Sequence, residues 1–175
     1  MSDRYCEAFT RACLVHIPKT GGSSLSSLQW LCAAHGHDIN VETVPKPAII
    51  VLRDPVARFL SAFDMFRAQR HITESVDEWF ADFEANINKD WPGHCFRPQS
   101  WYWDGKHRDD VVVLRTEWLD TLFGPDLPPR GDRRRNEARR NWAGVPDGTW
   151  ERTVLTDEQT AMVRRHYAAD YDLLR

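Results

Sequence analysis

Residues 16–24 read His-Ile-Pro-Lys-Thr-Gly-Gly-Ser-Ser, and this stretch decides the fold. The segment 12–17 is short, apolar and rich in β-forming residues, and a proline ends it, which predicts a buried strand. After the two glycines, residues 23–34 place leucines on one face of a helix, with a serine as its cap. The stretch therefore predicts a strand that leads through a glycine turn into a helix.

The alternation of strand and helix continues along the chain. Residues 48–52 and 111–114 have the composition of two more buried strands. The further helices are expected at 56–69, 76–87, 117–123 and 156–174. Thr156 begins the last of them, with Glu158 and Gln159 as partial partners of a capping box. This order predicts an α/β fold with a mostly parallel central sheet flanked by helices.

Length and composition predict a single soluble domain over residues 1–175. The chain is 42% hydrophobic and 28% charged, and its formal net charge is −3, which argues against nucleic-acid binding through overall charge. The longest apolar runs are far below the roughly 18 residues that span a bilayer. Charged residues within 1–13 exclude the apolar core of a signal peptide. We therefore expect a cytoplasmic protein with no membrane span and no nucleic-acid partner.

The turn at 18–24 combines several features of an anion-binding site. A glycine turn at a helix start directs several backbone N–H groups to one spot, and the helix dipole adds partial positive charge. Lys19 adds a full charge, and Ser23 and Ser24 add hydroxyl donors. The standard nucleotide-triphosphate loop has its lysine after the glycines, whereas Lys19 precedes them. The alternative interpretation is an ordinary strand–turn–helix with no ligand.

A second polar group follows the predicted strand at 48–52. Arg53 lies at the carboxyl end of this strand, where α/β folds bind ligands, and Ser61 follows about two helical turns later. A guanidinium and a hydroxyl together suit a phosphate. A structural turn with an ion pair at Arg53 and Asp54 is the alternative interpretation.

Together, the two segments resemble sulfotransferases that use 3′-phosphoadenosine 5′-phosphosulfate (PAPS), in particular the carbohydrate or glycosaminoglycan branch and its small bacterial relatives. The resemblance rests on Ile-Pro-Lys-Thr-Gly-Gly-Ser-Ser at 17–24 and Arg-Asp-Pro-Val-Ala-Arg-Phe-Leu-Ser at 53–61. Weaker matches follow in the same order at 113–119, 135–136 and 166–171. The resemblance implies a P-loop-like three-layer α/β/α fold and sulfuryl transfer to a carbohydrate or another small polyhydroxylated acceptor. It also implies adenosine 3′,5′-bisphosphate as the product and no required metal.

The resemblance implies residue roles toward PAPS. Lys19 would contact the 5′-phosphosulfate and steady the bridging oxygen. The remaining residues of the 5′-phosphate cradle would be Pro18, Thr20, Gly21, Gly22, Ser23 and Ser24. Arg53 and Ser61 would hold the 3′-phosphate.

A long loop is expected at 124–150 because this stretch is rich in proline and glycine. The resemblance implies that it covers the cofactor, with Arg135, Asn136 and Arg139 as candidate contacts. Its run of arginines is also compatible with a polyanion-binding patch or with a solvated charge run.

Three histidines are candidates for the base that accepts the proton of the acceptor hydroxyl. The resemblance favours His37 and then His35, which lie between the two phosphate motifs, and His94 is the third. A polar helix end is the alternative role for the first two. The aromatic segment 91–103 suits either a sugar-like acceptor or a tryptophan-rich edge of the core. Its candidate acceptor-binding residues are His94, Arg97, Gln99, Trp101 and Trp103.

Two other functions fit parts of the sequence. One is a P-loop kinase or nucleotide hydrolase, and the other is a non-catalytic protein that binds a nucleotide or polyanion. The position of Lys19 before the glycines, and the lack of a clear acidic strand end for Mg²⁺, favour sulfuryl transfer over the first alternative. The sequence predicts neither the identity of the acceptor nor the oligomeric state.

Overall fold

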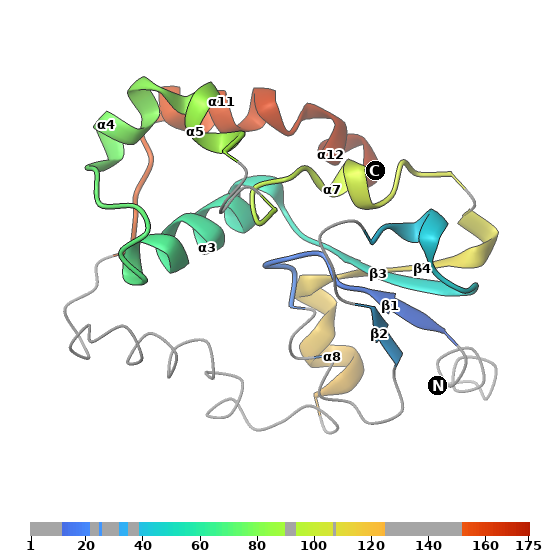
Figure 1. Cartoon of the computed structure of the whole chain (residues 1–175). Coiled ribbons are helices and arrows are strands. Elements are labelled where there is room, and N and C mark those ends of the chain that lie inside the picture. The colour runs from blue at the N-terminus through green and yellow to red at the C-terminus, as the bar shows by residue number, and fades with distance from the viewer. Residues whose placement is uncertain are drawn as a thin grey trace.

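The computed structural model describes residues 12–21, 25, 32–34, 39–89, 94–106, 108–124 and 152–175. Its strands are β1 (Cys13–Val15), β2 (Cys32–Ala34), β3 (Ala48–Leu52) and β4 (Val111–Arg115). All strand pairs in this described sheet are parallel, and the order is β2-β1-β3-β4 (Figure 1). The predicted α/β fold with a parallel sheet is therefore confirmed at this coarse level.

Helices follow the strands. Helix α3 (Pro55–Ala68) begins directly after β3, because Asp54 accepts the Ala57 N–H at 2.8 Å and Pro55 suits the first helical turn. The other α-helices are α4 (Val76–Ala81), α5 (Phe83–Ile87), α7 (Gln99–Tyr102), α8 (Leu119–Phe123), α11 (Asp157–His166) and α12 (Ala168–Leu173). Short 3₁₀ turns are η1 (Val41–Thr43), η2 (Arg108–Asp110) and η3 (Thr116–Trp118). Of the helices described, none is both long and apolar enough to cross a bilayer.

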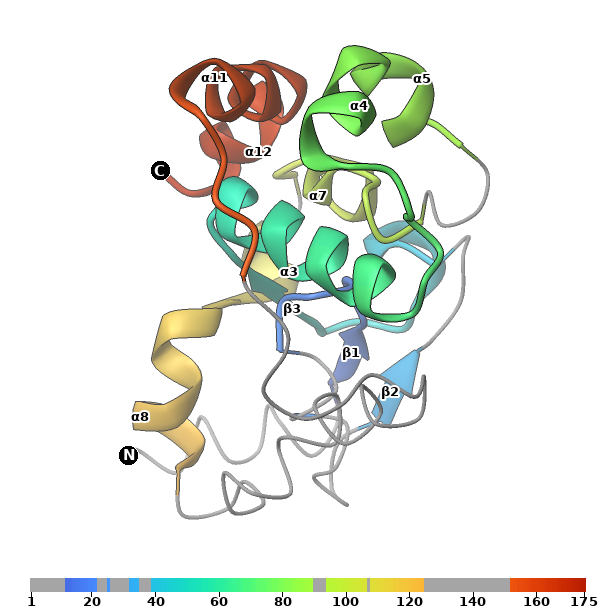
Figure 2. The same ribbon diagram turned by 90° about the vertical axis from the view of Figure 1, so that its left-hand side faces the viewer.

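The central strands are buried on both faces, as is usual for parallel strands. Leu14 and Ile49 pack in one cluster with Leu119 of α8. Ile50 belongs to a separate cluster that contains Tyr102 of α7. Both views place α8 on one side of the sheet and α7 and α12 on the other (Figure 1 and Figure 2).

A third hydrophobic cluster lies among α3, α4, α5 and α11. The rings of Phe59 and Phe63 on α3 stack with centroids 5.6 Å apart, and Trp79 of α4 lies 5.1 Å from Phe63. Phe96 joins them with its ring centroid 5.5 Å from that of Phe59. This packing fixes the segment 94–98 against α3, next to the carboxyl edge of the sheet.

Three expected helices differ from the structure. The helix expected at 23–34 is wrong at its end, because the last residues form β2 and pair with β1. The helix expected at 76–87 is divided at Asp82, whose backbone (φ −113°, ψ 38°) is not helical. The helix expected at 156–174 is likewise divided, at Tyr167 (φ −99°, ψ 26°).

The other predicted elements are confirmed with small shifts. The strands β1, β3 and β4 fall on the three predicted strands, and the helix expected at 56–69 is α3. The capping box of α11 is present, with the Gln159 N–H donating to the Thr156 hydroxyl at 3.2 Å and the Thr156 N–H donating to the Gln159 side chain at 3.0 Å. Beyond its first residue, the loop expected at 124–150 lies outside the described residues.

Candidate functional site

The segments that follow β1, β3 and β4 meet at one edge of the sheet. The Thr116 hydroxyl, just after β4, lies 2.7 Å from the Thr20 carbonyl oxygen and 3.3 Å from that of Leu52. In the described sheet β1 has β2 on one side and β3 on the other, so the strand order reverses at β1. Open α/β sheets bind ligands outside the carboxyl ends of the strands at such a reversal. The edge beyond β1 and β3 is therefore the candidate site.

The turn after β1 has a constrained backbone. Lys19 and Gly21 both adopt positive φ, at 69° and 93°. The Thr20 hydroxyl donates to the Ile17 carbonyl at 2.9 Å, and a Cβ on Gly21 would lie 2.7 Å from a methyl group of Leu119. The positive φ therefore favours glycine, and a larger residue would also force the Leu119 side chain to shift. A lysine in this region of φ is uncommon and indicates a conformation that its surroundings impose.

Arg53 connects the two predicted anion-binding segments. Its Nη1 donates to the Lys19 carbonyl at 2.9 Å, so the guanidinium reaches from the end of β3 to the turn after β1. Burial lowers the pKa of Arg53, while the negative charges of Glu117 and Asp54 oppose this shift. An arginine stays protonated in proteins. The edge therefore carries a fixed positive charge beside the turn.

One face of α3 borders the same turn. Arg58 Nε donates to the Pro18 carbonyl at 3.0 Å, and Lys19 Nζ lies 3.4 Å from the sulfur of Met65. Ser61 is three residues after Arg58 and four before Met65, so the three share one helix face. The structure thus brings Ser61, which is partly buried, to the side of α3 that borders the turn.

Arg58 is a candidate that the sequence analysis missed. Its side chain is 0% exposed, and Nη2 donates to the Cys95 carbonyl at 3.2 Å. Its Nη1 has no hydrogen-bond partner among the residues that the structure describes. The guanidinium thus places a buried positive charge beneath the turn, held there by the Pro18 and Cys95 carbonyls. The sequence feature that could have identified Arg58 is its position on the apolar face of an amphipathic helix, next to Phe59 and one turn before Ala62.

A pocket of about 160 Å³ is formed by residues of α5, the segment 94–98 and α11. Two predicted acceptor-side residues, His94 and Arg97, line it. The other lining residues are Ile87, Asn88, Lys89, Phe96, Pro98 and His166. The Arg97 guanidinium lies 4.0 Å from the ring centre of Trp101, which is 38% exposed. These imidazoles, cations and aromatic faces suit a polar ligand with an apolar surface.

Arg58 joins the segment that lines one side of the pocket to the turn after β1. A single guanidinium, that of Arg58, binds both the Pro18 carbonyl in the turn and the Cys95 carbonyl next to His94. Burial raises the pKa of the Cys95 thiol, and the positive charges of Lys19 and Arg58 oppose this rise. The same sulfur lies 3.3 Å from His94 Nε2. His94 is therefore on a segment that is in electrostatic contact with Lys19.

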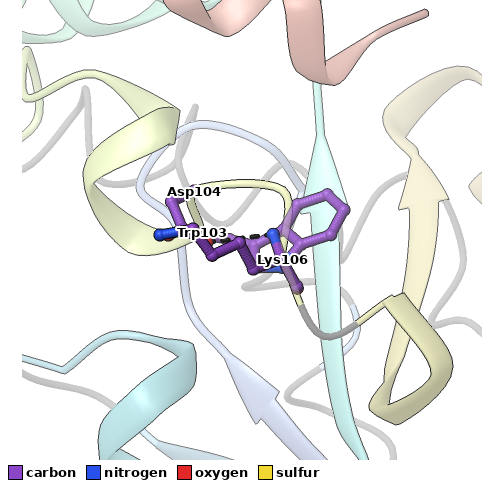
Figure 3. Close-up of polar contacts among 3 residues, drawn as sticks. All are labelled: Trp103, Asp104 and Lys106. Atoms are coloured by element: carbon purple, nitrogen blue, oxygen red, sulfur yellow. Dashed lines mark hydrogen bonds and ion pairs between the residues drawn. The ribbon is translucent and has the colours of Figure 1, made fainter.

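Two predicted acceptor-binding residues lie in the interior instead of in the pocket. Trp103 is 3% exposed, and its indole N–H donates to the Lys106 carbonyl at 2.6 Å, in a turn with a 2.7 Å ion pair between Asp104 and Lys106 (Figure 3). Gln99 is 0% exposed, and its amide binds the main chain of Arg53. These polar groups are used within the protein, which corrects the expectation that both side chains face the acceptor.

The remaining predicted site residues lie outside the described part of the chain. They are Gly22, Ser23, Ser24, His35, His37, Arg135, Asn136 and Arg139. No family model, curated protein or solved structure matches the chain. The resemblance of 17–24 and 53–61 to sulfotransferases thus rests on the sequence motifs alone.

Proposed function

We propose that the protein is a sulfotransferase that moves the sulfuryl group of PAPS to a hydroxyl group of a carbohydrate or another small polyhydroxylated acceptor. The observation that carries the proposal is the 2.9 Å hydrogen bond from Arg53 Nη1 to the Lys19 carbonyl. It joins two segments suited to anions at the point where the strand order reverses. A nucleotide with one phosphate on the 5′ side and one on the 3′ side suits two adjoining cation-bearing segments.

The proposal includes a P-loop-like three-layer α/β/α architecture. It is supported by the parallel sheet and by the placement of α8 and α7 on opposite faces (Figure 1). The turn of Lys19–Gly21 after β1 also supports the proposal, and the Leu25 N–H donates to the Gly21 carbonyl at 3.4 Å.

The charges of the site fit a ligand with several negative charges. Lys19 and the backbone of its turn would hold the 5′-phosphosulfate, and Arg53 with Ser61 would hold the 3′-phosphate. Arg58 is fully buried, so it contributes through its charge and through its hold on the Pro18 carbonyl. Charge-assisted hydrogen bonds from such groups are stronger than neutral ones.

The bound donor supplies an activated sulfuryl group on its 5′-phosphate. By analogy with phosphoryl transfer, the transition state has little bonding to either side, so the protein contributes alignment and charge stabilisation. The Lys19 ammonium group neutralises charge that develops on the bridging oxygen. The backbone of Lys19 is held by Arg53, which keeps this ammonium group near the site.

A histidine on the acceptor side takes the proton of the acceptor hydroxyl. His37, His35 and His94 are the candidates, and the position of His94 supports this role. It lines the pocket and precedes Cys95, whose thiol is within electrostatic reach of Lys19. The variants His94→Gln, His35→Gln and His37→Gln test the assignment, since loss of the base abolishes transfer and leaves nucleotide affinity unchanged. Full activity of His94→Gln would move the role to His37 or His35.

Calorimetry tests the proposed cofactor class. We expect the purified protein to bind adenosine 3′,5′-bisphosphate more tightly than ATP with Mg²⁺, because two separated anion-binding segments match the bisphosphate. Tight binding of ATP with Mg²⁺ and no binding of the bisphosphate would favour a kinase or hydrolase instead. Binding of the bisphosphate without any transfer or hydrolysis of the donor sulfate, over a broad acceptor panel, would favour a non-catalytic nucleotide-binding protein.

A further inference from the structure

The C-terminal helices hold the segment that leads into α7. The fully buried carboxylate of Asp170 on α12 accepts the backbone N–H of Gln99 at 2.8 Å and that of Ser100 at 2.8 Å. The hydroxyl of Tyr167, between α11 and α12, donates to the Phe96 carbonyl. These contacts fix the start of α7 from a part of the chain some 70 residues away.

Gln99 in turn holds the main chain of Arg53. Its side-chain oxygen accepts the Arg53 N–H at 2.9 Å, and its side-chain nitrogen donates to the Arg53 carbonyl at 2.9 Å. The amide satisfies both main-chain groups of the residue that follows β3, as a neighbouring strand would. Arg53 is thus anchored at its backbone by Gln99 and at its guanidinium by the Lys19 carbonyl.

We propose that Gln99 and Asp170 are positioning residues for Arg53, and that through them the C-terminal helix sets the preference of the site for a 3′-phosphorylated nucleotide. This inference rests on the proposed function, in which Arg53 binds the 3′-phosphate. Positioning matters because the guanidinium of Arg53 is planar, so its hydrogen bonds to a phosphate depend on its orientation. Neither Gln99 nor Asp170 needs to touch the nucleotide, and both are buried.

Calorimetry with two nucleotides separates positioning from general stability. Adenosine 3′,5′-bisphosphate carries the 3′-phosphate, and adenosine 5′-phosphate lacks it. Gln99→Met keeps a similar volume and removes both hydrogen bonds to Arg53. We expect it to weaken bisphosphate binding by about tenfold and monophosphate binding by less than about twofold. In an Arg53→Met background, Gln99→Met is expected to have little further effect on either nucleotide.

Asp170→Asn provides a second variant if Gln99→Met fails to fold. It keeps one acceptor oxygen and turns the other into an N–H donor that cannot accept a backbone N–H, so we expect a loss that is again confined to the bisphosphate. Asp172→Asn is the matched control, because Asp172 lies on the same helix in an exposed ion pair with Arg175. This control should bind both nucleotides as the unmodified protein does.

The outcomes separate the inference from the function on which it rests. If the unmodified protein shows no preference for the bisphosphate, or if Arg53→Met leaves that preference intact, the proposed role of Arg53 fails and the inference with it. If Arg53→Met removes the preference while Gln99→Met and Asp170→Asn keep it, only the inference is overturned. Equal losses for both nucleotides in a folded Gln99→Met variant would also overturn it.

Discussion

Lys19 combines an uncommon backbone conformation with a positively charged side chain. Its φ of 69° is held by the Arg53 guanidinium, which binds its carbonyl, and by Gly21, which continues the turn at positive φ. Its ammonium group lies 3.4 Å from the sulfur of Met65 on α3. In the proposed mechanism, a charge held in this way would lose little entropy when the nucleotide binds.

Lys19→Ala is expected to lower kcat by about a hundred- to a thousandfold, because the interaction that it removes grows in the transition state. Affinity for adenosine 3′,5′-bisphosphate should change much less, since Arg53 and the turn backbone remain. Steady-state kinetics and calorimetry measure the two effects. Lys106→Ala is the control, because Lys106 is an exposed lysine in a surface ion pair. A Lys19→Ala variant with unchanged kcat would contradict the assigned role.

Arg58→Ala is expected to lower the free energy of unfolding by about 2–5 kcal/mol. The substitution leaves a cavity at a fully buried position and removes the donors for the Pro18 and Cys95 carbonyls. Urea unfolding gives the value, and Arg165→Ala on the exposed side of α11 is the matched control. A change as small as in the control would show that Arg58 does not hold the turn and the 94–98 segment together.

At the residue scale, local spacing predicted which residues follow β1 and β3 at the edge that forms the candidate site. Lys19, Gly21 and Arg53 follow from a turn signal after a strand, which needs no knowledge of the rest of the chain. Gln99 was predicted to face an acceptor, but it binds Arg53 from 46 residues away. Arg58 was missed for the same reason, since its acceptors at Pro18 and Cys95 are set by tertiary packing.

At the scale of elements, strands were easier to predict than helix ends. The apolar runs of β3 and β4 are buried by neighbours on both sides, so their composition alone marks them. The residues of strand β2, Cys32–Ala34, were expected to end a helix. They form a strand instead, because pairing with β1 outweighs their helical preference. The divisions at Asp82 and Tyr167 lie within continuous apolar patterns, so periodicity gave no sign of them.

Helix α11 offers a test of capping at this scale. Thr156→Ala removes the side-chain acceptor of the Gln159 N–H and is expected to lower the free energy of unfolding by about 1 kcal/mol. Thr156→Ser keeps the hydroxyl and should restore most of this loss. Equal stability of the alanine and serine variants in urea unfolding would contradict a capping role.

At the scale of the whole molecule, stability is expected to fall in mild acid through His166. Burial lowers the pKa of His166, with Glu84 and Asp170 opposing the shift. In the unfolded chain a histidine titrates near about 6.5, so the unfolded state binds more protons below this pH than the folded state. The free energy of unfolding therefore decreases as the pH falls from about 7 toward the lowered pKa of the folded state.

His166→Gln should flatten this dependence, because the substituted side chain does not titrate. Urea unfolding of both proteins between about pH 5 and pH 7.5 measures the difference in slope. Parallel curves for the two proteins would show that His166 does not cause the loss of stability.

At the scale of the whole molecule, the α/β class could be predicted from the alternation of strands and helices. The contacts between segments far apart in the sequence could not. The parallel sheet was predictable because the sequence alternates between predicted strands and predicted helices. The contact between the C-terminal helix and the end of β3, through Asp170 and Gln99, depends on packing that no local pattern encodes. The edge of the sheet that forms the candidate site is thus contacted by residues from both halves of the chain.

A crystal structure with bound adenosine 3′,5′-bisphosphate tests the central claim most directly. The account predicts one nucleotide across the carboxyl ends of β1 and β3, with its 5′-phosphate at the turn that contains Lys19 and its 3′-phosphate at Arg53 and Ser61. A nucleotide bound elsewhere on the molecule, or one whose 3′-phosphate contacts neither Arg53 nor Ser61, would contradict it.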